Sequence, residues 1–172
     1  LSQWDAARMD FDETVRLKED FADAYLHRAL AHQGMKKYRE ADADFGTALD
    51  RGARQTRIYF LRSRVREKLG DSVGAKQDLA EGLKREPADE LSWIARGLAS
   101  IPGDPRRALA DFESALEANP RSKAALQNKA HVLAKYLQRT QDAIDTLDQA
   151  LALYPDDAPL RAGRGVYLAR LG

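Results

Sequence analysis

Small and large apolar residues recur at a fixed distance along the chain. The small residues are alanines spaced 34, 34, 33 and 35 positions apart: Ala7, Ala41, Ala75, Ala108 and Ala143. Four residues after each alanine comes a bulky apolar side chain, namely Phe11, Phe45, Leu79, Phe112 and Leu147. Spacings of three and four within a unit are helical. A period near 34 residues therefore predicts a series of helix pairs, in which the alanines lie where two helices approach closely.

The polar and helix-breaking residues between these units predict where the helices begin and end. Gly103, Asp104 and Pro105 combine a C-terminal glycine, a capping aspartate and a proline at the first helical position. The predicted helix pairs are 22–34 with 38–51, 56–69 with 72–85, 89–100 with 105–118, and 122–136 with 140–153, and single helices are predicted at 3–16 and 157–170. One residue is lost before Ala108, which predicts a shortened or bent helix end. One is gained before Ala143, which predicts a longer turn or a bulge.

A second column of the repeat carries long cationic side chains. Its members are Arg28, Arg62, Arg96, Lys129 and Arg164, each followed by Ala, Ser or Gly. We expect the aliphatic stems to pack over the next helix while the charged heads reach water or a carboxylate; a contact with a ligand is the alternative. The candidate partners are Asp10, Asp44, Asp78 and Asp111, which we expect to be exposed charges worth about 0.2–1 kcal/mol per pair.

Taken together, these columns resemble the tetratricopeptide repeat family over essentially the whole chain. The resemblance implies an all-α fold, a right-handed superhelical solenoid of antiparallel helix pairs with four full repeats and a half repeat at each end. It implies one domain over residues 1–172 and a concave groove, lined by the first helix of each repeat, that holds an extended peptide or a partner helix. A plain helical bundle is the alternative, and it does not explain so regular a stride.

Counting along the first helices predicts which side chains face this groove. The expected partner-binding residues are Leu26, Leu30, Arg57, Phe60, Arg64, Ile94, Leu98, Gln127, Asn128 and His131. The resemblance does not extend to the chaperone-tail clamps of the family, which grip carboxylates with Lys, Asn and Arg, because Asn128 is the only matching asparagine. The apolar members form either an exposed track for a partner or a part of the helix core. Successive residues of a helix are 100° apart, so an error of one residue in a helix boundary turns a side chain from the groove to the core. The sequence therefore leaves both interpretations open.

Composition and charge exclude several classes of function. The chain has 28 Lys and Arg against 27 Asp and Glu, and this balance argues against nucleic-acid binding. With no cysteine it has no disulfide and no thiolate metal site. His27, His32 and His131 lack the spacing of metal ligands, and no nucleophile motif is present. We expect no enzymatic activity, no cofactor and no metal.

The predicted function is protein–protein interaction in the groove, without membrane or nucleic-acid partners. No apolar run approaches the ~20 residues that span a bilayer, and we expect a cytoplasmic location. The alternative is a structural spacer or self-assembly segment that acts through its incomplete ends. The predicted end helices carry amphipathic faces that call for neighbours, with Trp4, Met9 and Phe11 at the start and Val166, Tyr167, Leu168 and Leu171 at the end. We therefore expect a fragment of a longer protein, or self-association through these ends.

Overall fold

The computed structural model describes residues 3–171, and within this range the chain forms ten α-helices and no strand. The helices are α1 (Gln3–Leu17), α2 (Ala22–Gly34), α3 (Tyr38–Asp50), α4 (Arg57–Leu69), α5 (Ser72–Lys84), α6 (Glu90–Ser100), α7 (Pro105–Ala118), α8 (Lys123–Lys135), α9 (Thr140–Leu153) and α10 (Ala158–Leu171). Every predicted helix is present, with its ends within one residue of the prediction. The periodicity of the apolar residues therefore locates the elements correctly.

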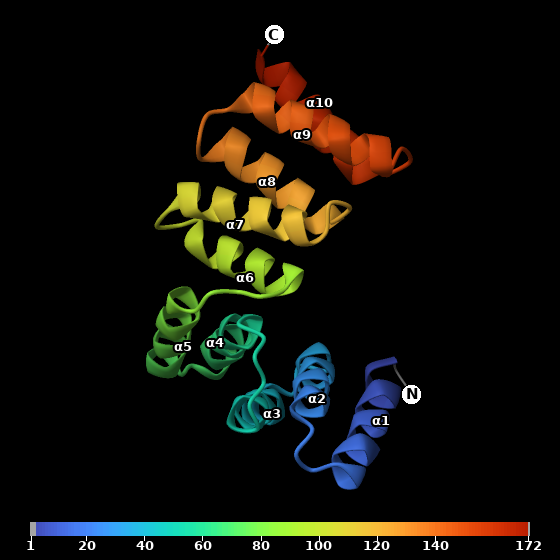
Figure 1. The fold of residues 1–172 in the computed structure, drawn as a ribbon, viewed down its shortest axis with the longest axis vertical. Helices are drawn as coiled ribbons and strands as arrows, with labels where there is room; N and C mark the ends of the chain where they lie inside the picture. The colour runs from blue at the N-terminus through green and yellow to red at the C-terminus, as the bar shows by residue number, and fades with distance from the viewer. Residues whose placement is uncertain (1–2, 172) are drawn as a thin grey trace. The chain divides into compact units, whose positions relative to one another are not determined.

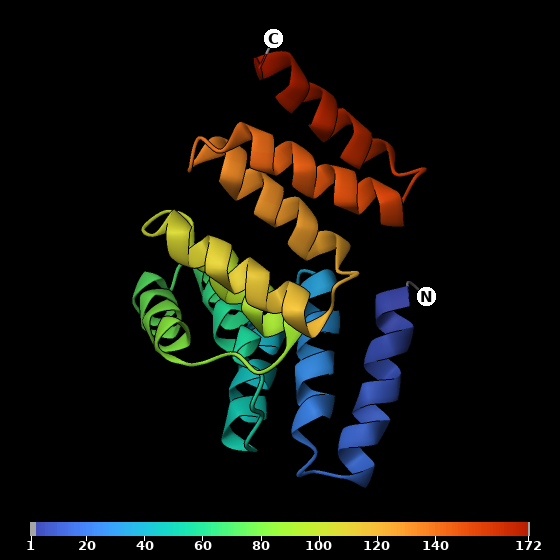
Figure 2. The ribbon, with the colours of Figure 1, turned by 45° about the horizontal axis from the view of Figure 1, so that its top comes forward.

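The chain divides into two units, residues 1–86 and 87–172, and each is described by itself. Unit 1 contains α1 to α5 and unit 2 contains α6 to α10 (Figure 1). In both, each helix packs against the next one along the chain, so that α2 pairs with α3 and α8 with α9. Figure 2 shows α1 and α2 lying side by side in unit 1, and α8, α9 and α10 following one another in unit 2. The prediction of one domain over residues 1–172 concerns how the two units join, and it stays a prediction.

The core of each unit is built from the columns of small and bulky residues. Ala41 and Ala108 are fully buried, and so are Phe45 and Phe112 four residues later. Close helix approach explains the small residues, as Gly97 of α6 shows most directly. A β-carbon at Gly97 would lie 2.6 Å from the ring of Phe112, so only glycine fits beside this ring. The predicted role of the small residues in helix packing is confirmed.

Local signals at the helix ends explain where the repeats turn. The side chains of Asp71, Asp89, Asp104 and Ser122 each accept a hydrogen bond from a backbone N–H of the helix that follows. The residue lost before Ala108 shortens α6 to 11 residues, against 13 in α2, α4 and α8. The residue gained before Ala143 falls in the turn 136–139, where Gln138 has φ 57°. Both predicted departures from the regular repeat are therefore present.

The cationic column pairs with carboxylates in two different ways. Arg28, Arg62 and Arg96 each reach the second helix of their own repeat, where Nη2 lies 2.7, 2.6 and 2.8 Å from an oxygen of Asp44, Asp78 and Asp111 respectively. These three aspartates are buried, which corrects the expectation that they are exposed charges. The long arginine stems carry the guanidinium groups into the helix interface, and the carboxylates are enclosed there with them. The hydrogen bond from Arg28 to Asp44 raises the pKa of Arg28 despite the opposing effect of burial.

The last two members of the column pair with the preceding helix instead. Lys129 Nζ lies 3.0 Å from Glu113, and Arg164 Nη1 lies 2.6 Å from Asp148. In the fifth copy of the repeat, Thr146 occupies the place of the buried aspartate. Asp10, the predicted partner in the first copy, forms no side-chain ion pair within the described residues, and Asp12 binds Arg28 in its place at 3.0 Å.

Candidate binding face of the first helices

The first helices of the repeats are α2, α4, α6, α8 and α10, and their burial shows which side faces outward. The residues two positions after each cation are Leu30, Arg64, Leu98, His131 and Val166, and all five are half-buried or exposed. The residues two positions before it include Leu26, Phe60 and Ile94, which are only 0%, 3% and 8% exposed. Of the two interpretations that the sequence left open for these three, their burial contradicts the exposed track and supports a place in the helix core. Leu26 lies one 100° helical step from the exposed His27, and this step turns it inward.

In unit 1 the remaining predicted residues lie in different environments. Leu30 is half-buried and packs against the core around Phe45. Arg57 is half-buried in the first turn of α4. Arg64 is exposed and lines a hollow of about 510 Å³ between the second half of α4, the end of α2 and the start of α3. The outward face of unit 1 is thus polar and basic around Arg64, with no continuous apolar track among these residues.

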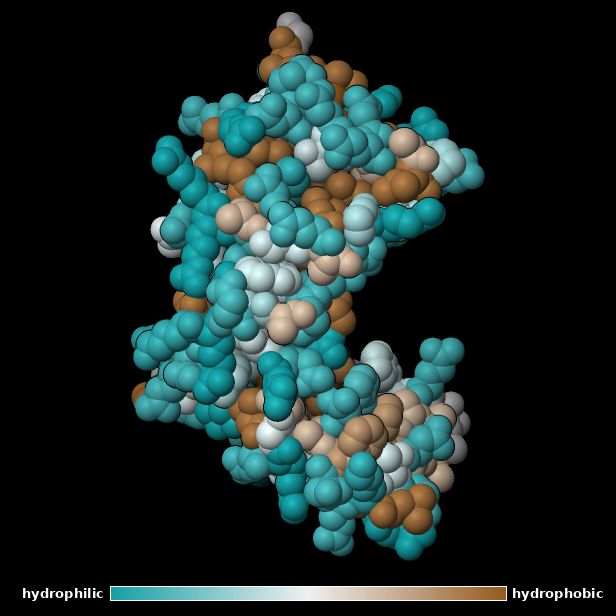
Figure 3. Space-filling view, in the orientation of Figure 1, coloured by the Kyte–Doolittle hydropathy of each residue, from teal (hydrophilic) through white to brown (hydrophobic). Residues whose placement is uncertain are grey.

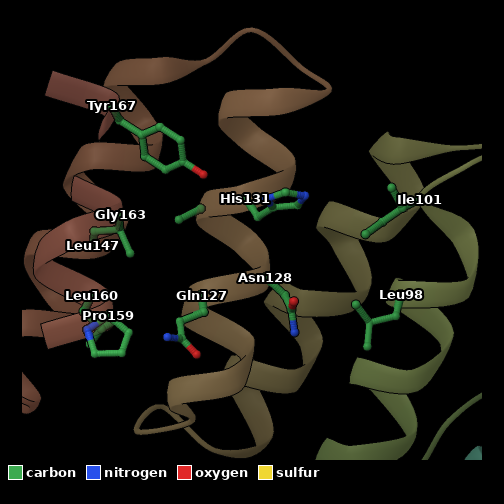
Figure 4. A pocket seen from close by; sticks show the side chains of 11 residues that line it. Leu98, Ile101, Gln127, Asn128, His131, Leu147, Pro159, Leu160, Gly163 and Tyr167 are labelled. Carbon is green, nitrogen blue, oxygen red and sulfur yellow. The ribbon is translucent and has the colours of Figure 1, made fainter. Parts of the chain in front are cut away.

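In unit 2 the structure brings four predicted residues together around one pocket of about 430 Å³. Leu98 comes from α6, and Gln127, Asn128 and His131 come from α8 (Figure 4). The remaining lining residues are Ile101, Ala130, Leu147, Pro159, Leu160, Gly163 and Tyr167. On the face shown in Figure 3, hydrophobic atoms reach the surface of unit 2 over α8, α9 and α10. The pocket therefore lies between the first helices of three successive repeats.

The sequence analysis missed the wall of the pocket that α10 supplies. Pro159, Gly163 and Tyr167 are spaced by four along one face of this helix, as Figure 4 shows. The cationic column could have predicted this wall, because Arg164 belongs to that column and so identifies α10 as the first helix of another repeat. Gly163 belongs to this wall. A β-carbon there would lie 3.6 Å from Leu147, an ordinary contact distance, so packing alone does not require glycine.

The pocket carries no fixed charge at neutral pH. None of its lining residues is Asp, Glu, Lys or Arg. Burial lowers the pKa of His131, and the nearby charge of Lys135 lowers it further, so the imidazole is neutral at pH 7. Burial also raises the pKa of Tyr167, and this effect exceeds the opposing influence of Arg170. The site is therefore suited to uncharged groups.

The polar side chains of the pocket are available to a ligand. The carboxamides of Gln127 and Asn128 form no hydrogen bond with any other residue in the described range 3–171. A carboxamide offers both donors and an acceptor, which match the C=O and N–H of an extended backbone. Apolar lining residues and two free carboxamides in the same pocket can together hold a side chain and the peptide bonds that flank it.

Two further features bear on the chemistry of the chain. Among residues 3–171, no group of three His, Asp or Glu side chains comes together as a metal site. Within the same part of the chain, none of the helices combines the length and the apolar character that crossing a membrane requires.

Comparison with known proteins identifies the repeat. The family patterns of the tetratricopeptide repeat match residues 102–167 and 22–51. Tetratricopeptide repeat protein 6 of Homo sapiens is 22% identical over 160 residues, which are 93% of this chain and 31% of that protein. The chain thus spans about a third of this relative.

Solved structures show the same fold. A thermophilic tetratricopeptide repeat protein of Thermus thermophilus superposes with a TM-score of 0.74 at 20% identity, covering 97% of this chain and 91% of the other. YrrB, described as a tetratricopeptide repeat protein with an unusual peptide-binding site, superposes with a TM-score of 0.61 at 22% identity, covering 95% and 84%. At these identities the likeness establishes the all-α solenoid fold. With the repeat columns, the ten helices and the family patterns all in agreement, this chain belongs to the tetratricopeptide repeat family.

Proposed function

We propose that the chain is a protein-interaction module that binds an extended peptide segment of a partner in the pocket of unit 2. The family supports a role as an interaction scaffold, and the peptide-binding site reported for YrrB supports peptide binding on this fold. The observation that carries the proposal is the pocket itself, with two free carboxamides among apolar lining residues. The proposal involves no catalytic step, cofactor or metal.

The chemistry of the pocket indicates what kind of peptide it takes. Leu98, Leu160 and Tyr167 form walls for one apolar side chain of the partner. Gln127 and Asn128 then hold the flanking backbone, with a net gain of about 0.5–1.5 kcal/mol for each hydrogen bond. A charged side chain is disfavoured, since the lining residues offer it no counter-charge. The partner segment is therefore extended and neutral, with an apolar anchor.

Selection from a displayed library of random peptides tests this proposal. The selected peptides should share an apolar anchor, and their binding should fall at least tenfold in Asn128→Ala combined with Leu98→Ala. The matched control is Gln149→Ala combined with Ala152→Ser on the exposed face of α9, which should bind the peptides normally. Circular dichroism checks that both variants keep their helices. Equal affinity of the folded pocket variant and the parent chain would move the site away from this pocket.

A second candidate function, self-association through the end helices, is supported by exposed apolar side chains on α10 and α1. Val166 and Leu168 of α10 are 52% and 48% exposed, and Trp4 of α1 is 50% exposed. Gly165 occupies the same position of the repeat as Gly97, but nothing lies within 4 Å of a β-carbon placed there. The surface of α10 around Gly165 therefore has space for a bulky side chain. The half-buried Phe11 of a second copy is a candidate for this space.

Sedimentation velocity across a range of concentrations tests self-association. We expect the chain to sediment as a dimer or larger species at high concentration. Gly165→Phe should shift it to the monomer, because the new side chain occupies the space beside α10 that the second copy would use. Ala152→Phe on the exposed face of α9 is the control and should leave the assembly intact. A parent chain that stays monomeric at all concentrations contradicts this second candidate and leaves the pocket proposal standing.

A further inference from the structure

Positive charge is concentrated on one helix of unit 1, although the chain as a whole is nearly neutral. The whole chain has 28 Lys and Arg against 27 Asp and Glu. Between residues 51 and 68 the only acidic residue is Glu67, and the basic ones are Arg51, Arg54, Arg57, Arg62, Arg64, Arg66 and Lys68. Charge separated in this way within a balanced chain creates a local positive potential. The relevant question is which of these cations have internal counter-charges and which face water.

Internal counter-charges account for one face of α4. Arg62 binds Asp78 at 2.6 Å, and Arg66 binds Asp42 at 2.8 Å. Arg64 lies on the opposite face, where it is exposed and forms no ion pair with any described residue; the same is true of Lys68. Helix packing in unit 1 thus uses two of the arginines of α4 and leaves these two cations facing water.

Arg64 and Lys68 line the hollow of about 510 Å³ together with Lys36, and we name this site the basic hollow. Lys36 belongs to the turn between α2 and α3 and is likewise without an ion pair in the described part of the chain. Glu67 also lines the hollow, so its net charge is +2 at pH 7. Tyr38 and Gln33 add a hydroxyl and a carboxamide. These groups converge from three segments on one concave site.

The backbone of the turn holds Lys36 in an uncommon conformation. Lys36 has φ 60°, in the left-handed region that side chains other than Gly and Asn rarely adopt. The turn 34 residues later places Gly70 at the same point of the repeat with φ 82°, which glycine adopts freely. The turn therefore favours glycine, yet a lysine stands there with its side chain on the basic hollow. Gln138 of unit 2 stands at the same point of the repeat with φ 57°, so the conformation belongs to the turn, and the cationic side chain on the basic hollow is what distinguishes Lys36.

We propose that the basic hollow binds an acidic segment of a protein partner through Lys36, Arg64 and Lys68. Asp or Glu side chains of the segment pair with these cations, while Tyr38 and Gln33 bond its backbone. A peptide fits better than a nucleic acid, since Glu67 among the cations repels a closely spaced row of phosphates. All lining residues lie in unit 1, so this proposal is independent of the pocket in unit 2.

Fluorescence anisotropy with the full 172-residue chain tests the binding. The probe is a labelled peptide of five Glu-Ala pairs, and its neutral counterpart contains Gln in place of Glu. We expect the acidic probe to bind and the neutral one to fail, with affinity falling as salt screens the charges. Amide chemical shifts of residues 33–38 and 64–68 should change on binding. Absence of binding at low salt, or shifts elsewhere only, overturns the proposal.

Charge reversal within unit 1 separates the basic hollow from general attraction. Arg64→Glu combined with Lys68→Glu should weaken binding of the acidic probe at least tenfold. Lys76→Glu combined with Lys84→Glu changes the net charge equally on α5, outside the hollow, and should weaken it less than twofold. Equal losses in the two variants contradict a defined site. Tighter binding of a short oligonucleotide than of the acidic peptide, lost in the same hollow variant, contradicts the peptide as its ligand.

The strained turn supplies a test that a purely structural role cannot mimic. Lys36→Gly should raise the midpoint of thermal unfolding by a few degrees, because glycine adopts a positive φ without strain. The same substitution should lower the affinity for the acidic probe several-fold. The matched control is Gln138→Gly, which relieves a φ of 57° in the turn between α8 and α9 of unit 2. It should also stabilise the chain but leave binding of the probe unchanged. Stabilisation of the Lys36 variant with unchanged affinity would falsify a binding role for Lys36.

Discussion

Helices α4 and α8 occupy the same place in the repeats of unit 1 and unit 2, and their inward sides are alike. Val65 and Val132 lie at corresponding positions and are 1% and 0% exposed. Ile58 and Ala125 also correspond, and both are fully buried. Helix packing requires apolar residues at these positions, because a closely packed interior excludes side chains whose polar groups have no partner.

The outward sides of the same two helices differ in chemistry. Arg64 of α4 opens on the basic hollow, whereas its counterpart His131 lines the neutral pocket of unit 2. Leu61 of α4 likewise corresponds to Asn128 of α8. The comparison teaches that the repeat fixes which positions face outward and leaves the residue type there free. Two units with the same fold can therefore present surfaces of different chemistry.

The cationic column shows a second contrast, between enclosed and open ion pairs, and it carries the largest predicted effect. Asp111→Ala should lower the free energy of unfolding by about 3–5 kcal/mol, because it removes the carboxylate that neutralises the buried guanidinium of Arg96. The side chains of Asp111 and Arg96 are only 2% and 8% exposed. Asp148→Ala should cost less than about 1 kcal/mol, since Asp148 and Arg164 are 51% and 36% exposed. Urea unfolding of the two variants measures both, and equal losses would remove the distinction between the two kinds of pair.

Overpacking tests the shared inward side of the repeats. Ala108→Phe should destabilise the chain by about 3 kcal/mol, since Ala108 is fully buried where two helices meet. Ala110→Phe lies two residues away on the exposed side of α7 and should change the stability by less than about 0.5 kcal/mol. Thermal unfolding monitored by circular dichroism distinguishes them. An unchanged midpoint for the Ala108 variant contradicts the packing role of the alanine column.

Much of the fold could be predicted because the same need for a small residue between two closely packed helices recurs in five copies of the repeat. The stride of the alanines located every helix to within one residue at each end, as Ala41 and Ala108 illustrate by their burial. Charge partners were harder to predict. Asp111 was expected to be exposed, and no periodicity indicates that its carboxylate is enclosed together with Arg96.

The candidate site could be predicted only in part. Leu98, Asn128 and His131 were expected in the groove and line the pocket. Phe60 was expected there too but lies in the core, where a β-carbon at Gly82 would lie 2.8 Å from its ring. Neighbouring positions of one helix are a single 100° step apart, and both the core-facing and the outward-facing positions carry Leu, Ile or Phe. Hydrophobicity alone therefore does not tell a core residue from a groove residue. The glycine opposite Phe60 was the informative signal.

A double-mutant cycle in unit 2 sharpens the contrast between the two kinds of ion pair. Thr146 occupies the place of the buried aspartate, which leaves Lys129 to pair with Glu113. Thr146→Asp alone should destabilise the chain by burying a carboxylate, and Lys129→Arg alone should have little effect. Together they rebuild the pair seen between Arg62 and Asp78, with a favourable coupling of about 1 kcal/mol. Additive effects of the two substitutions would show that the local helix geometry, and not the residue types, decides the pairing.

The smallest predicted effect concerns pH and the neutral pocket. Burial, with a contribution from Lys135, lowers the pKa of His131 in the folded chain. The unfolded chain binds a proton first, near pH 6.5, so the stabilising contribution of neutral His131 is present above that pH and is lost as the pH falls. A charged imidazole also disfavours an apolar ligand, and affinity for the pocket peptide should drop a few-fold between pH 7.5 and 5.5.

His131→Gln should flatten this pH dependence, whereas His27→Gln, at an exposed position of α2, should preserve it. The basic hollow provides the internal comparison, because Arg64 stands at the position of His131, and a guanidinium, unlike an imidazole, does not change its charge near neutral pH. The Glu-Ala probe should therefore bind equally at both pH values. Titration calorimetry with each peptide measures the two sites separately. A pH dependence that survives in the His131 variant would assign the titrating group to the peptide or to another residue, and the contrast between His131 and Arg64 would then no longer explain the difference between the two units.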